Sequence, residues 1–213
     1  MLDAVTLTGS LVRLEPVGPH HVGALVEASS EDPGAYRWNT MPRSEPAMAT
    51  YVADAAEWWR NGDGLTFATV RRADDRVVGC TRFTRAEYWS WADDSTRRRS
   101  DGTPDVVEIG YTWLAASAQR TGINVEAKRL MLAHAFDTWK VHRVSLDTDV
   151  RNHQSRQAIE ALGARFEGVV RAERIGADGT VRDSARFSII ADEWPDVRAH
   201  LDRRLAAWSR HVD

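Results

Sequence analysis

Alternating apolar and polar positions predict several β-strands along the chain. Residues 11–17 alternate as a half-buried strand does, because neighbouring side chains of a strand point to opposite faces. The same pattern, bounded by turn residues, places further strands at 65–70, 76–83, 106–114, 143–150, 166–175 and 182–190. The last two form a predicted hairpin around Ala177-Asp178-Gly179.

Helical spacing of apolar residues predicts five helices between these strands. Pro19 is suited to open the first, which we expect to end near Ser30. The others are expected at 46–60, 125–139, 152–162 and 192–208. The 125–139 helix is apolar around most of its circumference, so we interpret His134 as a core histidine. Strands alternating with helices in the second half indicate a mixed or partly parallel sheet, and thus one α/β domain over residues 1–213.

Composition narrows the class of protein. The 213 residues are 43% hydrophobic and 28% charged, as in an ordinary globular domain. A net charge of -3 gives no general attraction for nucleic acid, and no stretch has the character of a signal peptide or membrane span. The lone Cys80 is expected to be a buried inert thiol. We therefore expect a soluble cytoplasmic protein.

Two segments between predicted elements carry candidate chemistry. The predicted 106–114 strand places Val107, Ile109, Tyr111 and Trp113 on one face and Glu108 on the other. The loop 119–124 then precedes the buried helix, with Asn124 expected at its N-cap. Free backbone N–H groups and the helix dipole favour a pyrophosphate there, and Gly122 permits close approach. The alternative for this loop is an ordinary tight turn.

The helix predicted at 152–162 presents a polar group inward. Ser155, Ala158, Ile159 and Leu162 share one face, whereas Arg156 points away. Ser155 could serve a reaction, or Asn152 could cap the helix while Ser155 bonds nearby backbone. The histidines, including His20-His21, show no metal-binding spacing, so we predict no metal.

These segments resemble one family. The stretches 107–111, 113–114 and 119–127, followed by Asn152, Ser155 and Gly163-Ala164, resemble the GNAT acyltransferases, in the branch of the ribosomal-protein N-terminal acetyltransferases. The resemblance extends from the first strand to Ile190. It implies a mixed sheet of about seven strands with a splayed pair, flanked by helices, and a reaction between an acyl-coenzyme A (acyl-CoA) and an amine.

The resemblance also assigns residues. It implies that the CoA pyrophosphate binds Gln119, Arg120, Thr121, Gly122, Ile123 and Asn124, although the family usually has glycine or alanine at position 124. The pantetheine arm would pair with the backbone of Trp113 and Leu114 and with Asn152. Many relatives use a tyrosine to protonate the thiolate, but residues 158–161 contain none, and Ser155 matches the serine of the ribosomal branch. Glu108 is the first candidate base, with Asp147 and Glu173 as alternatives.

We therefore predict an N-acyltransferase that moves an acetyl or succinyl group to a primary amine of a protein or peptide. The alternatives are acylation of a small amine, such as an antibiotic or metabolite, and a CoA-binding sensor without catalysis. The family builds its acceptor groove from segments that correspond to 36–59 and 85–104, the latter a long loop. The tryptophan-rich end of the chain, including Trp194 and Trp208, predicts a homodimer.

Overall fold

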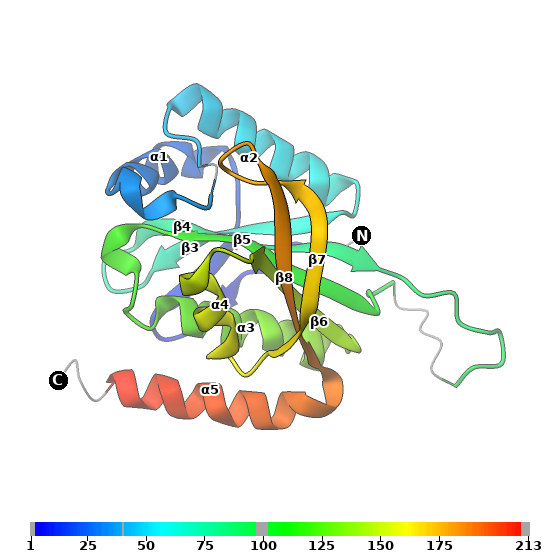
Figure 1. The fold of residues 1–213 in the computed structure, drawn as a ribbon. Helices are drawn as coiled ribbons and strands as arrows, with labels where there is room; N and C mark the ends of the chain where they lie inside the picture. Colours follow the sequence, from blue (N-terminus) through cyan, green and yellow to red (C-terminus); the bar gives the residue numbers. More distant parts are fainter. Residues whose placement is uncertain (1–2, 40, 97–101, 210–213) are drawn as a thin grey trace.

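The computed structural model describes residues 3–39, 41–96 and 102–209, and in these residues eight strands form one mixed sheet (Figure 1). The strands are β1 (Leu7–Thr8), β2 (Val12–Pro16), β3 (Gly64–Arg71), β4 (Arg76–Glu87), β5 (Val106–Leu114), β6 (Arg143–Asp149), β7 (Arg165–Ile175) and β8 (Val181–Ile190). Their order is β1-β2-β3-β4-β5-β6-β8-β7, and only the β5–β6 pair is parallel. The predicted α/β class is confirmed, and the short β1 accounts for the strand beyond the seven expected.

Helices cover both faces of this sheet (Figure 1). They are α1 (Val22–Ser30), α2 (Glu45–Arg60), α3 (Ile123–Ala133), α4 (His153–Glu160) and α5 (Trp194–Ser209). The helices α1 and α2 pack on β4 and β3, while α3 lies against β2 on the opposite face and is covered by α5. Each predicted helix is present, although Pro19 opens a 3-10 turn and α3 ends in a π-helical turn, His134–Thr138. No helix in the described ranges is long and apolar enough to cross a membrane.

The sheet opens between β5 and β6. These strands pair at Val106–Glu108 with Arg143–Ser145 and then separate, which confirms the predicted splayed pair. A β-bulge follows immediately, because Thr81 of β4 faces both Tyr111 and Thr112 of β5. Tyr111 adopts a φ of 51° and is 46% exposed. The prediction that Tyr111 shares the core face with Ile109 is therefore wrong, because the bulge breaks the alternation.

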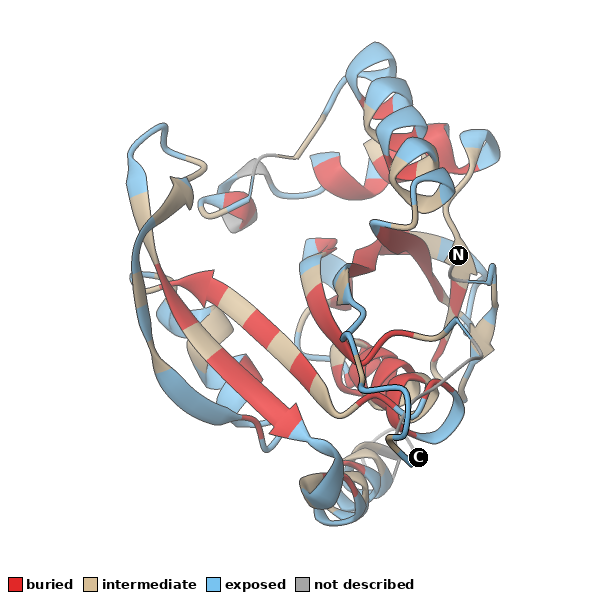
Figure 2. Cartoon of the chain, turned by 90° about the vertical axis from the view of Figure 1, so that its right-hand side faces the viewer, coloured by how far each residue is buried: buried red, intermediate tan, exposed pale blue. Residues whose placement is uncertain are grey.

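The C-terminal helix closes the core. Trp194 is 4% exposed, stacks on Phe136 with ring centroids 5.5 Å apart and donates from Nε1 to Asp137 Oδ1 at 2.9 Å. The expectation that Trp194 forms part of an exposed apolar patch is therefore wrong. Figure 2 shows that buried residues line the inner strands, whereas the outer hairpin strand is largely exposed. His134 packs against Trp139 with ring centroids 4.5 Å apart, as expected of a core histidine.

A buried carboxylate joins α3 to the N-terminal strands. Glu126 is 6% exposed, and its two oxygens accept hydrogen bonds from Ser10 N, Ser10 Oγ, Leu11 N and Val12 N over 2.6–2.9 Å. These donors belong to the turn between β1 and β2 and to the first residue of β2. Since buried backbone N–H groups require partners, the carboxylate completes this turn while fixing the rotation of α3.

Replacement of Glu126 by Gln should lower the free energy of unfolding by roughly 2 kcal/mol or more, because an amide nitrogen cannot accept the hydrogen bonds of a carboxylate oxygen. Urea unfolding followed by circular dichroism measures this loss. Glu57→Gln, at an exposed position of α2, provides the matched control and should change stability little. Equal stability of the two variants would show that the turn does not depend on the carboxylate.

Candidate functional site

A cavity of about 660 Å³ occupies the opening between β5 and β6. Most of the residues predicted from sequence line it: Glu108, Trp113, Leu114, Gln119, Arg120, Gly122, Asn124, Asn152 and Ser155. Thr121 and Ile123 are absent from its lining and contribute to a smaller pocket behind the loop. The cavity reaches from the start of α3 to the start of α4. Sequence segments that lie more than thirty residues apart therefore share one site.

The loop before α3 bends through left-handed backbone at two positions. Arg120 has a φ of 60° and Gly122 a φ of 86°. Gly122 is the N-cap of α3, so the prediction that Asn124 holds this position is wrong, and Asn124 lies within the first turn. The first N–H groups of a helix have no intrahelical partner and carry the positive end of its dipole. This end of the cavity therefore has the chemistry of an anion site.

Side chains from two further elements complete this end. Arg204 and Trp208 of α5 line the cavity beside Arg120 and Gly122, although the sequence did not identify α5 as part of the site. A Cβ on Gly122 would meet Leu11 Cδ1 at 3.0 Å and the Trp208 ring at 3.1 Å. A larger residue at position 122 would therefore disturb the packing of α5 as well as the loop. Arg120 and Arg204 add positive charge where the dipole already favours an anion.

The opposite wall begins with α4. Asn152 is the N-cap of α4, and its Oδ1 accepts a hydrogen bond from Ser155 N at 3.0 Å. Capping, one of the two roles considered for Asn152, is therefore present. The side-chain amide retains two N–H donors, so capping leaves it able to bind a carbonyl group in the cavity. Ile159 and Leu162 of the same face are buried, which turns Ser155 toward the opening as predicted.

The end of β5 is held by two side chains. Tyr36 Oη and Gln119 Nε2 each donate to the carbonyl oxygen of Leu114 at 3.1 Å. The edge of Tyr36 also faces the Trp113 ring, with centroids 6.0 Å apart. Both lone pairs of the Leu114 carbonyl are thus occupied. Gln119, which we predicted to contact a phosphate, also fixes the strand that leads into its own loop.

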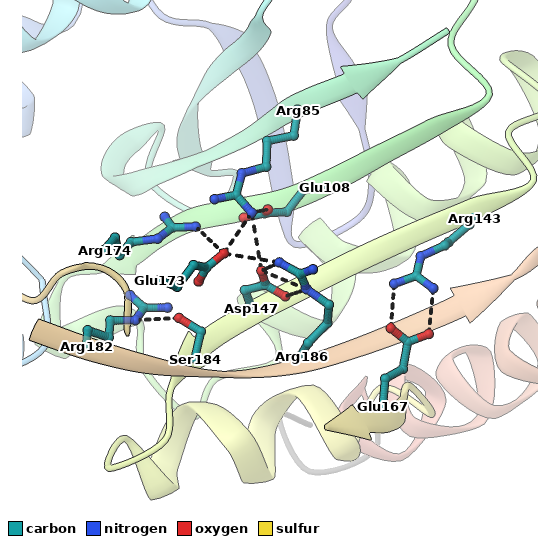
Figure 3. A network of polar contacts seen from close by, with 10 residues as sticks. All are labelled: Arg85, Glu108, Arg143, Asp147, Glu167, Glu173, Arg174, Arg182, Ser184 and Arg186. Atoms are coloured by element: carbon teal, nitrogen blue, oxygen red, sulfur yellow. Dashed lines mark hydrogen bonds and ion pairs between the residues drawn. The ribbon is translucent and has the colours of Figure 1, made fainter. Parts of the chain in front are cut away.

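Three carboxylates meet at the point where the strands separate (Figure 3). Glu108 of β5 and Asp147 of β6 are nearly inaccessible, and Glu173 of β7 lies beside them. Arg85 Nη1 lies 3.2 Å from Glu108 Oε2, 3.4 Å from Asp147 Oδ2 and 3.1 Å from Glu173 Oε1. Arg186 binds Asp147 as well, with Nη2 to Oδ2 at 2.9 Å. All three candidate bases therefore belong to one network.

The network distinguishes these carboxylates. Burial and the charge of Asp147 raise the pKa of Glu108, although Arg85 opposes the change. Burial also disfavours ionised Glu173, but the Ser184 hydroxyl, Arg174 and Arg85 together lower its pKa to about 2. A carboxylate with a low pKa is a weak base, whereas a raised pKa strengthens one. Glu108, which also lines the cavity, is thus the better suited to accept a proton.

A buried lysine is among the lining residues that were not predicted from sequence. Lys128 of α3 is 4% exposed and contributes to the cavity wall. Helical spacing places it one turn after Asn124, on the same face, which is the signal that could have identified it. Without that signal, a lysine on a helix is expected to be exposed to solvent.

Two further predictions concern other potential reactive groups. Burial raises the pKa of the Cys80 thiol to about 12, in agreement with an inert thiol. Glu15, His20 and His21 bring potential metal ligands within 4.8 Å of one another, which their spacing in the sequence did not suggest. Glu15 is already paired with Arg13 through Oε1 and lies 3.3 Å from His21 Nε2 through Oε2, and His21 Nδ1 accepts a hydrogen bond from Gly18 N. These contacts occupy groups that an ion would need.

Comparison with known proteins agrees with this architecture. The family model described as acetyltransferase (GNAT) domain matches residues 12–165. YdaF of Bacillus subtilis (strain 168), a candidate ribosomal N-acetyltransferase, is 32% identical over 87 residues, which are 41% of this chain. That match spans less than half of YdaF, 46% of its length.

Solved structures match nearly the whole chain. A GCN5-related N-acetyltransferase from Brucella melitensis has a TM-score of 0.80 and 27% identity, over 96% of this chain and 86% of that one. Mycobacterium smegmatis RimJ in complex with CoA-disulfide has the same fold, with a TM-score of 0.76 and 21% identity over 94% and 93% of the two chains. The family expected from the sequence is thus confirmed, and the chain belongs to the GNAT acetyltransferases.

Proposed function

We propose that this protein is a cytoplasmic N-acyltransferase that moves an acetyl group from acetyl-CoA to a primary amine, at the N-terminus or a lysine of a protein or peptide. The observation that carries the proposal is the continuity of the cavity. One space joins the anion site at the start of α3 to Glu108 and Ser155. A ligand with phosphates at one end and a thioester at the other would bring its reacting carbon to these two residues.

Binding of acyl-CoA would use groups of fixed position. The N–H groups at the start of α3, with Arg120 and Arg204, would bind the pyrophosphate. The Asn152 amide and the backbone of β5 would bind the amides of the pantetheine arm. Pairing between β5 and β6 ends at Glu108, so this part of β5 has no neighbouring strand on the β6 side. Such an edge offers N–H and C=O groups to an extended ligand.

The reaction would then need little further chemistry. The amine arrives as an ammonium ion and must lose a proton, which Glu108 is suited to accept directly or through water. Its nitrogen bonds to the thioester carbon, the C–S bond breaks, and the nitrogen releases its second proton to solvent as the amide forms. The departing thiolate takes a proton from the Ser155 hydroxyl, which recovers one from solvent. Positioning of the two reactants supplies a large part of the rate.

Several features support a protein or peptide acceptor. The wall of the cavity includes Trp38, Tyr111 and Ile175 of the β7–β8 hairpin, together with Glu108. Apolar side chains around a buried carboxylate suit an amine that belongs to a peptide, because the adjoining peptide residues can pack against them. The similarity to YdaF, a candidate ribosomal N-acetyltransferase, supports the same class of acceptor. A small amine would leave much of this wall uncovered.

Release of free thiol from acetyl-CoA and succinyl-CoA, measured against peptide and small-amine acceptors, tests the proposal. Turnover with acetyl-CoA and peptides is the expected result. Turnover with small amines alone would contradict the proposed peptide acceptor. A preference for succinyl-CoA would contradict the proposed acetyl donor. Tight CoA binding without turnover on any acceptor would favour a sensor and overturn the enzymatic assignment.

Ser155→Ala should lower kcat by roughly 10- to 10³-fold, because a general acid acts in the transition state. The affinity for acetyl-CoA, measured by calorimetry, should change little. Ser30→Ala, at an exposed position of α1, is the control and should retain full activity. Weaker binding at constant kcat would instead assign the Ser155 hydroxyl to the pantetheine arm.

Glu108→Gln should lower kcat/KM by roughly 10²- to 10⁴-fold and flatten its dependence on pH. The raised pKa of Glu108 means that the carboxylate, and with it the activity, is lost as pH falls through a value above 4.5. The wild-type profile should therefore have an acidic limb that the variant lacks. Glu167→Gln, which alters the Arg143 pair outside the cavity, should preserve that limb. An acidic limb that persists in Glu108→Gln would assign the base elsewhere.

The homodimer remains a prediction, but its support now comes from the β7–β8 hairpin. β7 is an edge strand, and it exposes Phe166 by 50%, Val169 by 48% and Ile175 by 76%. Exposed apolar side chains on an unpaired edge favour association. Light scattering at micromolar concentration should give a dimer for the wild type and a monomer for Val169→Asp. A monomeric wild type would contradict the prediction.

A further inference from the structure

Lys128 is held by hydroxyl groups in the wall of the cavity. Its Nζ donates to Thr81 Oγ1 at 2.7 Å and to Thr112 Oγ1 at 2.6 Å, and the two hydroxyls are 2.9 Å apart. Lys128 and Thr112 line the cavity, whereas Thr81 lies behind them and does not. The amine thus stands between the sheet and the space that a ligand would fill.

Lys128 has no acidic partner among the described residues. Glu126 of the same helix turns toward the β1–β2 turn, and Glu108 of β5 pairs with Arg85. Arg82 of β4 points to the other face of the sheet, stacked between Trp58 and Tyr111. Burial, the sole cause, lowers the pKa of Lys128 to about 7. A buried amine without a counter-ion is costly, and such a group in a cavity wall is a candidate for a functional role.

The hydrogen-bond inventory leaves one donor free. An ammonium group has three N–H donors and no acceptor, and the two threonines take two of them. Lys128 and its partner Thr112 both form part of the cavity wall, so a ligand in the cavity can approach Nζ. A ligand that supplies one more acceptor would complete the set and favour the charged form of the amine.

The position along α3 selects the chemical class of that acceptor. Lys128 comes six residues after Gly122, which is roughly 9 Å along a helix. A phosphate bound at the N-terminus of α3 would lie too far away for direct contact. A CoA molecule extends at that distance into its pantetheine arm, whose polar acceptors are carbonyl oxygens.

We propose that the ammonium group of Lys128 donates its third hydrogen to a carbonyl oxygen of the acyl-CoA arm, and that Lys128 is thereby a binding residue for the coenzyme. The inference rests on the proposed binding of acyl-CoA in this cavity. Bound coenzyme should stabilise the protonated amine, so binding would draw a proton onto Lys128 near neutral pH. Arginine could not replace it, because a guanidinium is larger and holds its proton at all accessible pH values.

Lysine content makes a direct experiment possible. Of the 28 lysines and arginines in the chain, only Lys128 and Lys140 are lysines, and Lys140 is exposed. Protein labelled with ¹³C at lysine Cε should give two side-chain signals by nuclear magnetic resonance, assigned with Lys140→Arg. Titration should give Lys128 a pKa near 7 in the free protein and a value at least about one unit higher with saturating CoA, a tenfold preference of CoA for the charged form.

Two comparisons separate a direct contact from attraction by the distant phosphates. The rise should persist in 0.5 M NaCl, because salt screens only the longer-range interaction. Lys128→Met should weaken CoA binding about tenfold or more in calorimetry at pH 6.5 and less at pH 8.5, while Lys140→Met should match the wild type. If Lys128→Met fails to fold, the titration of Lys128 in the wild type still tests the inference.

Each outcome has a distinct meaning. A pKa of Lys128 that stays constant or falls on CoA binding, or unchanged affinity of a folded Lys128→Met variant, would overturn the inference and leave Lys128 a link between α3 and the sheet. A rise that salt abolishes would likewise overturn the carbonyl contact. Failure of the wild type to bind CoA would instead contradict the proposed function itself.

Discussion

The site depends on the early end of pairing between β5 and β6. Parallel pairing stops at Glu108, and β5 continues to Leu114 with a bulge opposite Thr81 of β4 and no partner from β6. A sheet that stayed closed would have no room for the cavity and no free strand edge. Because the core on both faces covers the central strands, the opening is held by packing and does not require a ligand to form it.

Burial of charge at this opening follows from the same constraint. The side chains of Glu108 and Asp147 are buried where the two strands begin to diverge, and arginines from other elements contact their carboxylates (Figure 3). Arg85 contacts three carboxylates at once, so no single pair neutralises Glu108. This incomplete pairing is consistent with the raised pKa of Glu108. An arginine that paired with Glu108 alone would lower that pKa.

The sequence predicted the elements well because each has a local period. It also placed Ser155 correctly, since helical spacing alone turns that residue inward. The errors at Asn124, Tyr111 and Trp194 have nonlocal causes: a left-handed Gly122 ends the loop two residues earlier, a bulge reverses the strand faces, and Phe136 covers the tryptophan. Lys128 was missed because its partners come from β4 and β5, distant in sequence.

The helix α3 connects the two ends of the proposed coenzyme site. Its N-terminus offers N–H groups to phosphates, and Lys128 lies on the following turn, in the wall of the cavity. Glu126 lies between these positions and fixes the rotation of α3 through four hydrogen bonds to the β1–β2 turn. If that rotation changed by even one residue, about 100°, Lys128 would leave its threonine partners. A structural carboxylate outside the cavity thus determines which side chains of α3 a ligand meets.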